Sequence, residues 1–186
     1  MVFAASLAAT VAGIGVPAMT NAIDEWRTAA AARYLAGRLG SARLDAVRHS
    51  RATALRFELS DSSSSDGDYA FASIADGNGN GVRTADIRDG IDTVAVAAER
   101  LRDKFPSVRF ELTSGATDAD GSTGTGTDGV RIGSSQILTM SADGTSSSGT
   151  LYIRGRRAQY AVRVLGVTGR TRVLQYLAGN GTWINR

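Results

Sequence analysis

The chain has 186 residues, with 21 basic and 18 acidic side chains, a formal net charge of +3, no cysteine and a single histidine. The absence of cysteine excludes disulfides and thiolate metal sites, and one histidine excludes a multi-histidine metal site. If roughly the first 50 residues form one long helix, the remainder is still long enough for one domain with its own hydrophobic core.

The first segment, Met1 to Ile23, contains no charged side chain. An apolar helix of about 20 residues crosses the hydrocarbon core of a bilayer, which is about 30 Å thick. The segment is rich in Ala and Gly, small residues that let helices pack closely, and Pro17 is expected to loosen its end. We expect residues 1–23 to be the transmembrane half of a helix. The alternatives are a signal peptide and a buried core helix. A signal peptide normally begins with basic residues, and none precedes Arg27.

From Asn21 to about Arg51 the pattern is that of an amphipathic helix. Apolar residues recur mostly at steps of three and four, which is typical of a helix face that packs on a core: Trp26, Ala30, Tyr34, Leu35, Leu39, Ala42, Ala46 and Val47. Arginines fill much of the other face, either as a solvated surface or as a basic binding surface. The sequence therefore predicts one continuous helix from Met1 to about Arg51, whose residues 24–51 pack on a globular domain. His49 is expected to have a structural or surface role.

Residues 52–186 are predicted to form a β-rich globular domain of about eight short strands. Alternating or β-rich runs bounded by turn residues lie at 52–59, 69–75, 92–97, 108–112, 136–140, 150–154, 159–165 and 172–177. The segment 113–129 consists almost entirely of Ser, Thr, Gly, Asp and Ala, so we expect a mobile loop there. A long helix packed on an antiparallel sheet is an α+β fold.

The segment 76–86 carries oxygen ligands at alternate positions, followed by a glycine: Asp76, Asn78, Asn80 and Gly81. This order resembles the start of a calcium-binding loop of the EF-hand type. The match then weakens, because the twelfth position is Ile87 and the nearest acid, Asp86, falls one place early. Asn-Gly and Asp-Gly pairs are also common in hairpin turns. The segment is therefore interpreted as a structural turn, with calcium binding as the alternative.

Charge is distributed very unevenly along the chain. Residues 24–58 hold seven arginines against four acids, residues 59–150 hold seven basic side chains against fourteen acids, and residues 151–186 hold seven arginines and no acid. Clustered positive charge without acids is the electrostatic signature of nucleic-acid binding.

Two of the C-terminal arginines, Arg170 and Arg172, stand two residues apart at the start of a predicted strand. Residues two apart on a strand point to the same side, and guanidinium groups suit phosphate. One hypothesis is therefore a DNA-binding surface made of Arg170, Arg172, Arg154, Arg156 and Arg157. The interleaved aromatic residues could stack on bases: Tyr152, Tyr160, Tyr176 and Trp183. The alternative is that these aromatic residues belong to the core and the arginines keep an exposed sheet soluble.

Four places in the chain together resemble the GspH/FimT group of type IV pilin-like proteins, which are minor pilins and pseudopilins. The uncharged segment with Pro17 resembles the hydrophobic pilin helix. The run Leu39-x-x-Ala42-Arg43-x-x-Ala46-Val47-Arg48 is similar to the helix end of this group, and Asp76–Asp86 resembles its loop between strands. Three stretches together resemble the C-terminal signature of the group: Asp143-Gly144-Thr145, Gly149-Thr150-Leu151 and Gly169-Arg170-Thr171-Arg172.

The resemblance implies a pilin-like fold and a non-enzymatic subunit without cofactor or metal. Such a subunit is stored in the bacterial inner membrane as a single-pass protein with a periplasmic domain. A prepilin peptidase cuts it, and it joins other pilins or pseudopilins in a filament through its N-terminal helix. The peptidase site, a Gly followed by Phe and shortly after by Glu, is absent here. Aligning the proline suggests that the chain begins a few residues inside the mature protein.

The family divides by function. One branch serves the pseudopilus of type II secretion, which transports proteins. The other serves type IV pili and DNA uptake, where the Gly-Arg-x-Arg motif is implicated in holding DNA. We expect a minor pilin or pseudopilin, with a DNA-binding minor pilin as the alternative and a membrane-tethered enzyme as the third possibility.

Overall fold

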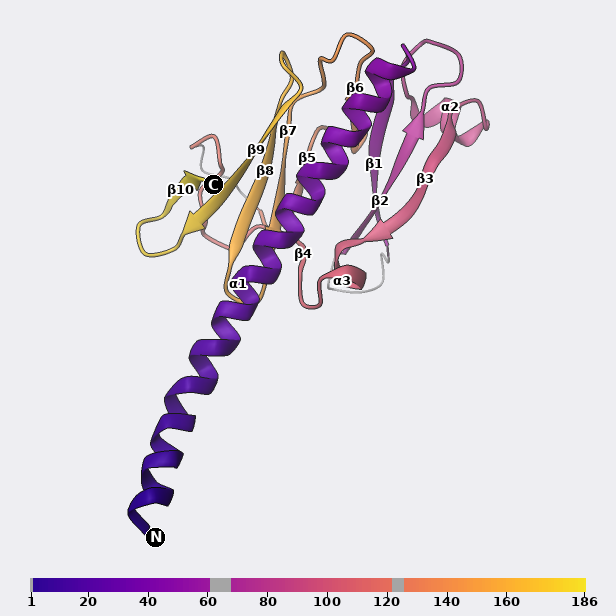
Figure 1. Ribbon diagram of the computed structural model, residues 1–186. Coiled ribbons are helices and arrows are strands. Elements are labelled where there is room, and N and C mark those ends of the chain that lie inside the picture. The colour runs from indigo at the N-terminus through magenta and orange to yellow at the C-terminus, as the bar shows by residue number, and fades with distance from the viewer. Residues whose placement is uncertain (1, 61–67, 122–125) are drawn as a thin grey trace.

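One long helix dominates the architecture (Figure 1). The computed structural model describes residues 2–60, 68–121 and 126–186, and their side chains from Met19 onward. Helix α1 runs without interruption over Val2–Arg48, 47 residues, so the prediction of a single continuous helix is confirmed. Its first half extends away from the rest of the chain, and its second half lies on the β-strands. The loosening expected at Pro17 lies outside the part whose side chains are described.

The described strands form two antiparallel sheets. The first has the order β3-β2-β1-β6 and comprises β1 (Thr53–Leu59), β2 (Tyr69–Ala75), β3 (Thr93–Arg100) and β6 (Ile137–Met140). The second has the order β10-β9-β8-β7-β4, with β5 also paired to β7. It comprises β4 (Arg109–Phe110), β5 (Val130–Arg131), β7 (Gly149–Arg154), β8 (Gln159–Leu165), β9 (Arg170–Leu177) and β10 (Thr182–Asn185). The α+β expectation is confirmed, although the strands form two sheets.

Four short elements are absent from the sequence prediction. They are α2 (Thr84–Arg88), α3 (Leu101–Lys104), β5 and β10. Both helices are one turn long, and an isolated turn of helix shows no periodicity of its own. Strand β5 has two residues and is defined by pairing with β7, a partner about 20 residues further along the chain, which no local pattern can reveal.

Helix α1 packs on strands of both sheets: β1 and β6 of the first, and β7, β8 and β9 of the second. The main core lies in between. From the helix, the side chains of Leu35, Leu39, Ala42 and Ala46 enter it, and from the sheets come Phe57, Phe71, Phe110, Leu138, Leu151 and Val162. The rings of Phe57 and Phe110 meet edge to face at 5.7 Å, a favoured aromatic geometry. The alanines of α1 let the helix backbone approach both sheets closely.

Two residues expected on the buried face of α1 are exposed. Trp26 is 80% exposed and Val47 is 46% exposed. The buried face instead runs through Asp24, Thr28, Leu35, Leu39, Ala42 and Ala46. Trp26 lies two residues from both Asp24 and Thr28, which places it about 200° around the helix, on the opposite side. The prediction that these two apolar residues face the core was wrong.

Among the helices with described side chains, none is both long enough and apolar enough to cross a membrane. Most of the uncharged run expected to do so, residues 1–18, lies outside the part of the chain with described side chains.

Candidate functional site

The helix and the β-domain are joined by a buried carboxylate. Asp24 is 8% exposed, and its oxygens accept hydrogen bonds from three backbone N–H groups of the β7–β8 turn: Arg156 at 2.9 Å, Arg157 at 2.9 Å and Ala158 at 3.3 Å. Burial alone would raise the pKa of Asp24. The three N–H groups, together with the positive charge of Arg156, lower the pKa below its usual value. Asp24 therefore holds the turn as an anion.

The turn can reach Asp24 because Gly155 has no side chain. A Cβ atom at Gly155 would overlap the Thr28 hydroxyl and approach Asp24 Oδ1 to 2.9 Å. The sequence analysis did not single out Asp24. The sequence did contain a signal for this role. Asp24 lies on the same helical face as Thr28 and Leu35, and an acid on a buried face needs hydrogen-bond partners.

At the other end of the domain, two of the four places that resemble the pilin-like family meet: the helix end and the C-terminal signature. Arg43 of α1 donates a hydrogen bond from Nε to the carbonyl oxygen of Gly144 at 2.8 Å. Gly169 lies against both, because a Cβ atom there would overlap the Gly144 oxygen and come within 2.7 Å of Arg43 Nε. Gly169 also has a φ of +59°, a conformation that favours glycine. We call Arg43, Gly144 and Gly169 the arginine clasp.

The clasp places Arg170 and Arg172 on the second sheet. The two residues lie at the start of strand β9, immediately after Gly169, and both side chains are exposed. Arg172 lies directly opposite Arg163 of β8, so three guanidinium groups share one face of the sheet, the face away from α1. Neither Arg170 nor Arg172 forms an ion pair with any residue that the structure describes. Strand β10 pairs only with residues 174–177 of β9. The part of β9 that carries Arg170 and Arg172 is therefore not paired with β10.

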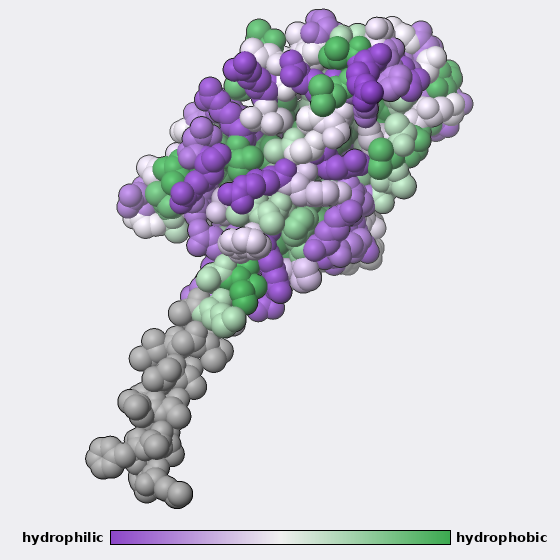
Figure 2. Space-filling model, in the orientation of Figure 1, coloured by the Kyte–Doolittle hydropathy of each residue, from purple (hydrophilic) through white to green (hydrophobic). Residues whose placement is uncertain are grey.

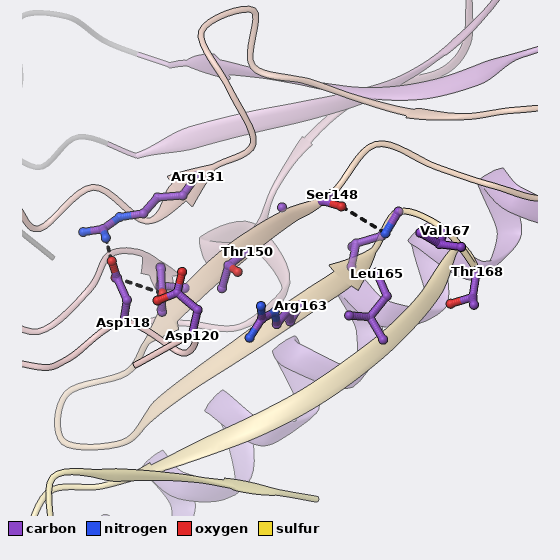
Figure 3. A pocket seen from close by; sticks show the side chains of 13 residues that line it. Asp118, Asp120, Arg131, Ser148, Thr150, Arg163, Leu165, Val167 and Thr168 are labelled. Carbon is purple, nitrogen blue, oxygen red and sulfur yellow. Dashed lines mark hydrogen bonds and ion pairs between the residues drawn. The ribbon is translucent and has the colours of Figure 1, made fainter. Parts of the chain in front are cut away.

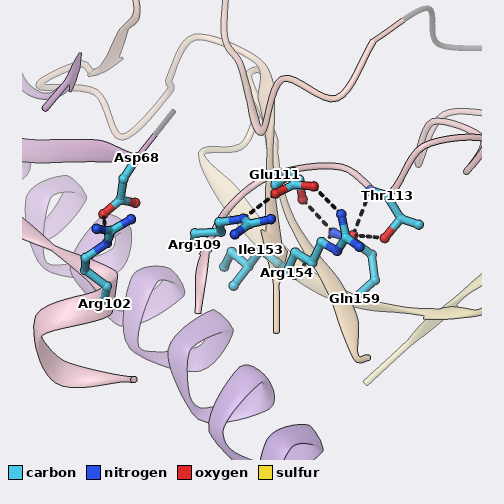
Figure 4. A network of polar contacts seen from close by, with 8 residues as sticks. All are labelled: Asp68, Arg102, Arg109, Glu111, Thr113, Ile153, Arg154 and Gln159. Atoms are coloured by element: carbon cyan, nitrogen blue, oxygen red, sulfur yellow. Dashed lines mark hydrogen bonds and ion pairs between the residues drawn. The ribbon is translucent and has the colours of Figure 1, made fainter. Parts of the chain in front are cut away.

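Arg154, also expected in the DNA-binding surface, is already paired with an acid. Its guanidinium forms an ion pair with Glu111, and Arg109 binds the other oxygen of the same carboxylate (Figure 4). Gln159 bridges the network to Glu111 O at 3.0 Å and to Thr113. Arg154 therefore shares the single negative charge of Glu111 with Arg109, and Glu111 lies more than 40 residues away in the sequence.

Arg156 and Arg157 are exposed, but they lie at the opposite end of the hairpin from Arg170. They occupy the β7–β8 turn beside Asp24, whereas Arg170 follows the β8–β9 turn. The seven residues of β8 separate the two turns, about 20 Å at strand rise. The structure thus brings Arg163, Arg170 and Arg172 together and does not bring the five predicted arginines into one patch.

An open pocket of about 550 Å³ lies beside the β8–β9 turn that precedes the arginine pair (Figure 3). It is lined by Asp118, Asp120, Arg131, Thr150 and Arg163, with the β8–β9 turn at one end. Arg131 forms an ion pair with Asp118, so the pocket carries acids as well as arginines. Mixed charge makes this hollow a poor phosphate site, and the unopposed positive charge lies beside it on β9.

The four aromatic side chains expected to stack on bases belong to the protein interior. Tyr152 and Tyr160 are buried, and Tyr176 and Trp183 are partly buried. Trp183 packs on the ring of Tyr152 at 5.6 Å and on that of Tyr176 at 5.1 Å. Burial raises the pKa of Tyr152 to about 12, and a hydrogen bond to Asp118 adds to this rise. The interpretation as core residues was the correct one.

The loop 113–129 is described except for residues 122–125. Ala116 and Asp118 are buried in it, Ala119 N donates to the Tyr152 hydroxyl at 3.0 Å, and Leu112 N donates to Thr127 O at 2.9 Å. These contacts anchor both described arms to the second sheet. Mobility of the loop stays a prediction.

The carboxylate of Asp76 in the segment 76–86 and that of Asp92 just after it bind backbone N–H groups, whereas Asp86 Oδ2 is buried without a hydrogen-bond partner among the described residues. Asp76 accepts hydrogen bonds from the N–H groups of Asn78, Gly79 and Gly81. Asp92 accepts from the N–H groups of Gly77 and Arg83. Within the described ranges, no group of three or more His, Asp or Glu side chains is arranged to hold a metal ion. The hydrogen bonds support the structural-turn interpretation.

His49, expected to be structural or at the surface, is exposed, and its Nδ1 lies 3.0 Å from the carbonyl oxygen of Asp45.

Comparisons with protein-family models, with curated proteins and with solved structures each find no match to the chain.

Proposed function

We propose that the chain is a non-enzymatic subunit of a type IV pilin-like filament, a minor pilin or pseudopilin. The observation that carries the proposal is the division of α1. One helix of 47 residues extends beyond the domain over its first half and forms the core of the domain over its second half. A subunit that polymerises through a helix needs this division, because one half must stay available to neighbouring subunits while the other holds the domain.

The arginine clasp supports the same proposal. Arg43, Gly144 and Gly169 lie in three separate stretches of resemblance, and they meet at one point. Stretches that resemble one family and also pack together are more informative than stretches scattered over a fold, because a shared contact explains why they occur together. The resemblance itself rests on the residues named above.

In this proposal the first half of α1 is stored in the bacterial inner membrane and later packs against other pilins or pseudopilins. The β-domain lies on the periplasmic side. The filament serves type II secretion or a type IV pilus.

The test follows the protein when it is expressed with a C-terminal epitope tag from its own chromosomal locus. We expect the tagged chain in the inner membrane fraction, with its domain open to protease added from the periplasmic side. Filaments sheared from the cells should contain it, and deleting the assembly ATPase should remove it from the sheared fraction. A chain that stays in the cytoplasm, or whose place in the sheared fraction does not depend on the ATPase, refutes the proposal.

DNA binding through Arg170 and Arg172 is the second candidate function. The observation that favours it is the placement of Arg172 directly opposite Arg163. Like charges directly across an antiparallel pair destabilise a sheet, and no acid described in the structure pairs with Arg172. A polyanion bound along this face would remove the repulsion. Phosphate contacts of this kind bind without sequence preference, with dissociation constants on the order of 10 to 100 micromolar at physiological salt.

Fluorescence-polarisation titrations of labelled duplex DNA at two salt concentrations test this function. Arg170→Ala with Arg172→Ala should weaken binding to all sequences and lower the salt slope by about 2, since each phosphate contact contributes roughly one. The matched control is Arg156→Ala with Arg157→Ala, an equal charge change in the same acid-free segment at the opposite end of the hairpin. Equal weakening by both pairs would assign the binding to the overall charge of the segment, and unchanged binding by the Arg170→Ala, Arg172→Ala variant would show that the arginines beside the clasp hold no DNA.

A further inference from the structure

The polarity of α1 is inverted where it leaves the domain. Asp24, on the side that faces the domain, is 8% exposed, while Trp26, on the side that faces outward, is 80% exposed. Met19 and Ile23 share the outward side and are 68% and 39% exposed. A helix at the surface of a soluble domain normally buries its apolar residues and exposes its charges. Here, from Met19 to Trp26, about two turns do the opposite.

The exposed apolar residues form one patch. Together with Ala22 and the base of Arg27 they line a shallow, almost wholly apolar hollow of about 390 Å³. Figure 2 shows hydrophobic side chains gathered where the helix emerges below the domain. An exposed apolar patch of this kind marks an interaction surface.

Basic side chains surround the same level of the helix. Arg27 follows Trp26, and the β7–β8 turn, which Asp24 holds against α1, carries Arg156 and Arg157 with exposed side chains. Two acids lie at the same level: Asp24, whose buried carboxylate accepts hydrogen bonds from the turn, and Glu25, which accepts a hydrogen bond from Gln175 at 2.9 Å. We call the patch and these three arginines the collar.

The uncharged character of the preceding helix indicates what the collar meets. From Val2 to Ile23 the chain has no charge, and these residues rise about 33 Å along a helix, close to the roughly 30 Å hydrocarbon core of a bilayer. Trp26 lies one turn beyond. Tryptophan is enriched at the boundary between acyl chains and headgroups, and arginine side chains reach from there to phosphates.

We propose that the collar sits in the surface of an anionic phospholipid bilayer, with Trp26 at the acyl–headgroup boundary and Arg27, Arg156 and Arg157 against lipid phosphates. The inference rests on the membrane-stored state of the proposed function. It adds that the domain rests directly on the bilayer, in a fixed orientation, because Asp24 holds the basic turn on the same helical turn that carries Trp26.

The experiment uses the full chain reconstituted in vesicles of phosphatidylcholine with or without phosphatidylglycerol. The chain has two tryptophans, so Trp183→Phe leaves Trp26 as the only reporter. Bromine-labelled lipids carry the quencher either near the headgroup or at the acyl end. We expect Trp26 emission to shift to the blue and to lose at least half its intensity with the shallow label and little with the deep one. If Trp183→Phe does not fold, the signal of Trp26→Phe is subtracted from that of the parent.

The arginines are tested in the same vesicles. Arg156→Ala with Arg157→Ala should remove the extra shallow quenching that phosphatidylglycerol provides, while Arg170→Ala with Arg172→Ala, at the far end of the hairpin, should leave it unchanged. Water-like, unquenched Trp26 emission from a chain that sediments with the vesicles overturns the proposal. So does a blue shift without lipid quenching that grows with the protein-to-lipid ratio, which would assign the patch to a second copy.

Failure of this inference is distinguishable from failure of the filament function. A chain that enters sheared filaments but shows no quenching refutes the collar alone. A chain that is quenched as expected but never enters filaments refutes the filament function alone.

Discussion

Replacing Asp24 by alanine should loosen the domain from its helix. The carboxylate accepts two hydrogen bonds of 2.9 Å and one of 3.3 Å from the β7–β8 turn. A hydrogen bond to a charged group contributes about 1.5–3 kcal/mol to stability. The turn is near the surface, so water can solvate the released N–H groups, and we count only the two short bonds at the low end of that range. The expected loss is about 3 kcal/mol.

The measurement is thermal unfolding of the full chain in detergent, followed by near-ultraviolet circular dichroism. For a domain of this size a loss of 3 kcal/mol lowers Tm by roughly 10 °C. Asp24→Asn keeps one acceptor oxygen and should lose about half as much. Native-state amide exchange gives a local readout, because Arg156, Arg157 and Ala158 should lose protection before the rest of β8.

The matched control is Asp45→Ala on the same helix. Asp45 is exposed and its side chain holds no turn, so its replacement should change stability by less than about 0.5 kcal/mol. The reasoning is refuted if Asp24→Ala melts within about 2 °C of the parent, or if Asp45→Ala loses as much. Unchanged amide protection at the turn would refute it independently.

Three further predictions follow from the same contacts. Gly169→Ala should lose at least about 2 kcal/mol of stability through backbone strain and overlap with the clasp. Gly181→Ala measures the strain alone, because Gly181 is also at positive φ and a Cβ atom there would meet only the Tyr176 hydroxyl, at 3.9 Å. Equal losses of the two variants in chemical denaturation would contradict the overlap. Because the pKa of Asp24 is lowered in the folded state, its contribution is complete above the ordinary aspartate range and is lost as pH falls through the folded pKa. The stability difference between the parent and Asp24→Asn should therefore shrink below about pH 4, and a difference that stays constant down to acid unfolding would contradict this. Finally, a chain that begins at Met19 should fold with a higher Tm than one that begins at Arg27, and equal melting temperatures would show that the helix start carries no domain contact.

The long helix could be predicted from the sequence, whereas its outward face could not. The uncharged run and the three- and four-residue spacing are local patterns, and the helix follows them. Trp26 matches the spacing about as well as the residues that are buried, and hydropathy does not distinguish an apolar residue in the core from one on an interaction surface. Which side faces the domain is decided by the contacts of Asp24 with the β7–β8 turn, more than 130 residues away in the sequence.

The arginine surface shows the same limit in another form. Arg154 looked available because its partner, Glu111, is distant in sequence and directly follows β4, which pairs with β7. Contacts of that separation depend on sheet order, which no single strand encodes. The separation of Arg156 and Arg157 from Arg170 was predictable, since consecutive turns of an antiparallel meander lie at opposite ends of their strands.

The unbroken course of α1 has a consequence for how the domain is aimed. Along an α-helix each residue adds a rotation of about 100° and a rise of 1.5 Å. The first half of α1 and the domain held at Asp24 share one helical axis. The number of residues between them therefore sets the rotation of the domain about that axis, and with it the direction in which each surface of the domain faces. Inserting one residue in this interval would turn the arginine clasp and its neighbouring strand by more than a quarter of a circle while lifting the domain by less than the width of an atom. Helical phase, more than height, therefore decides what the domain faces.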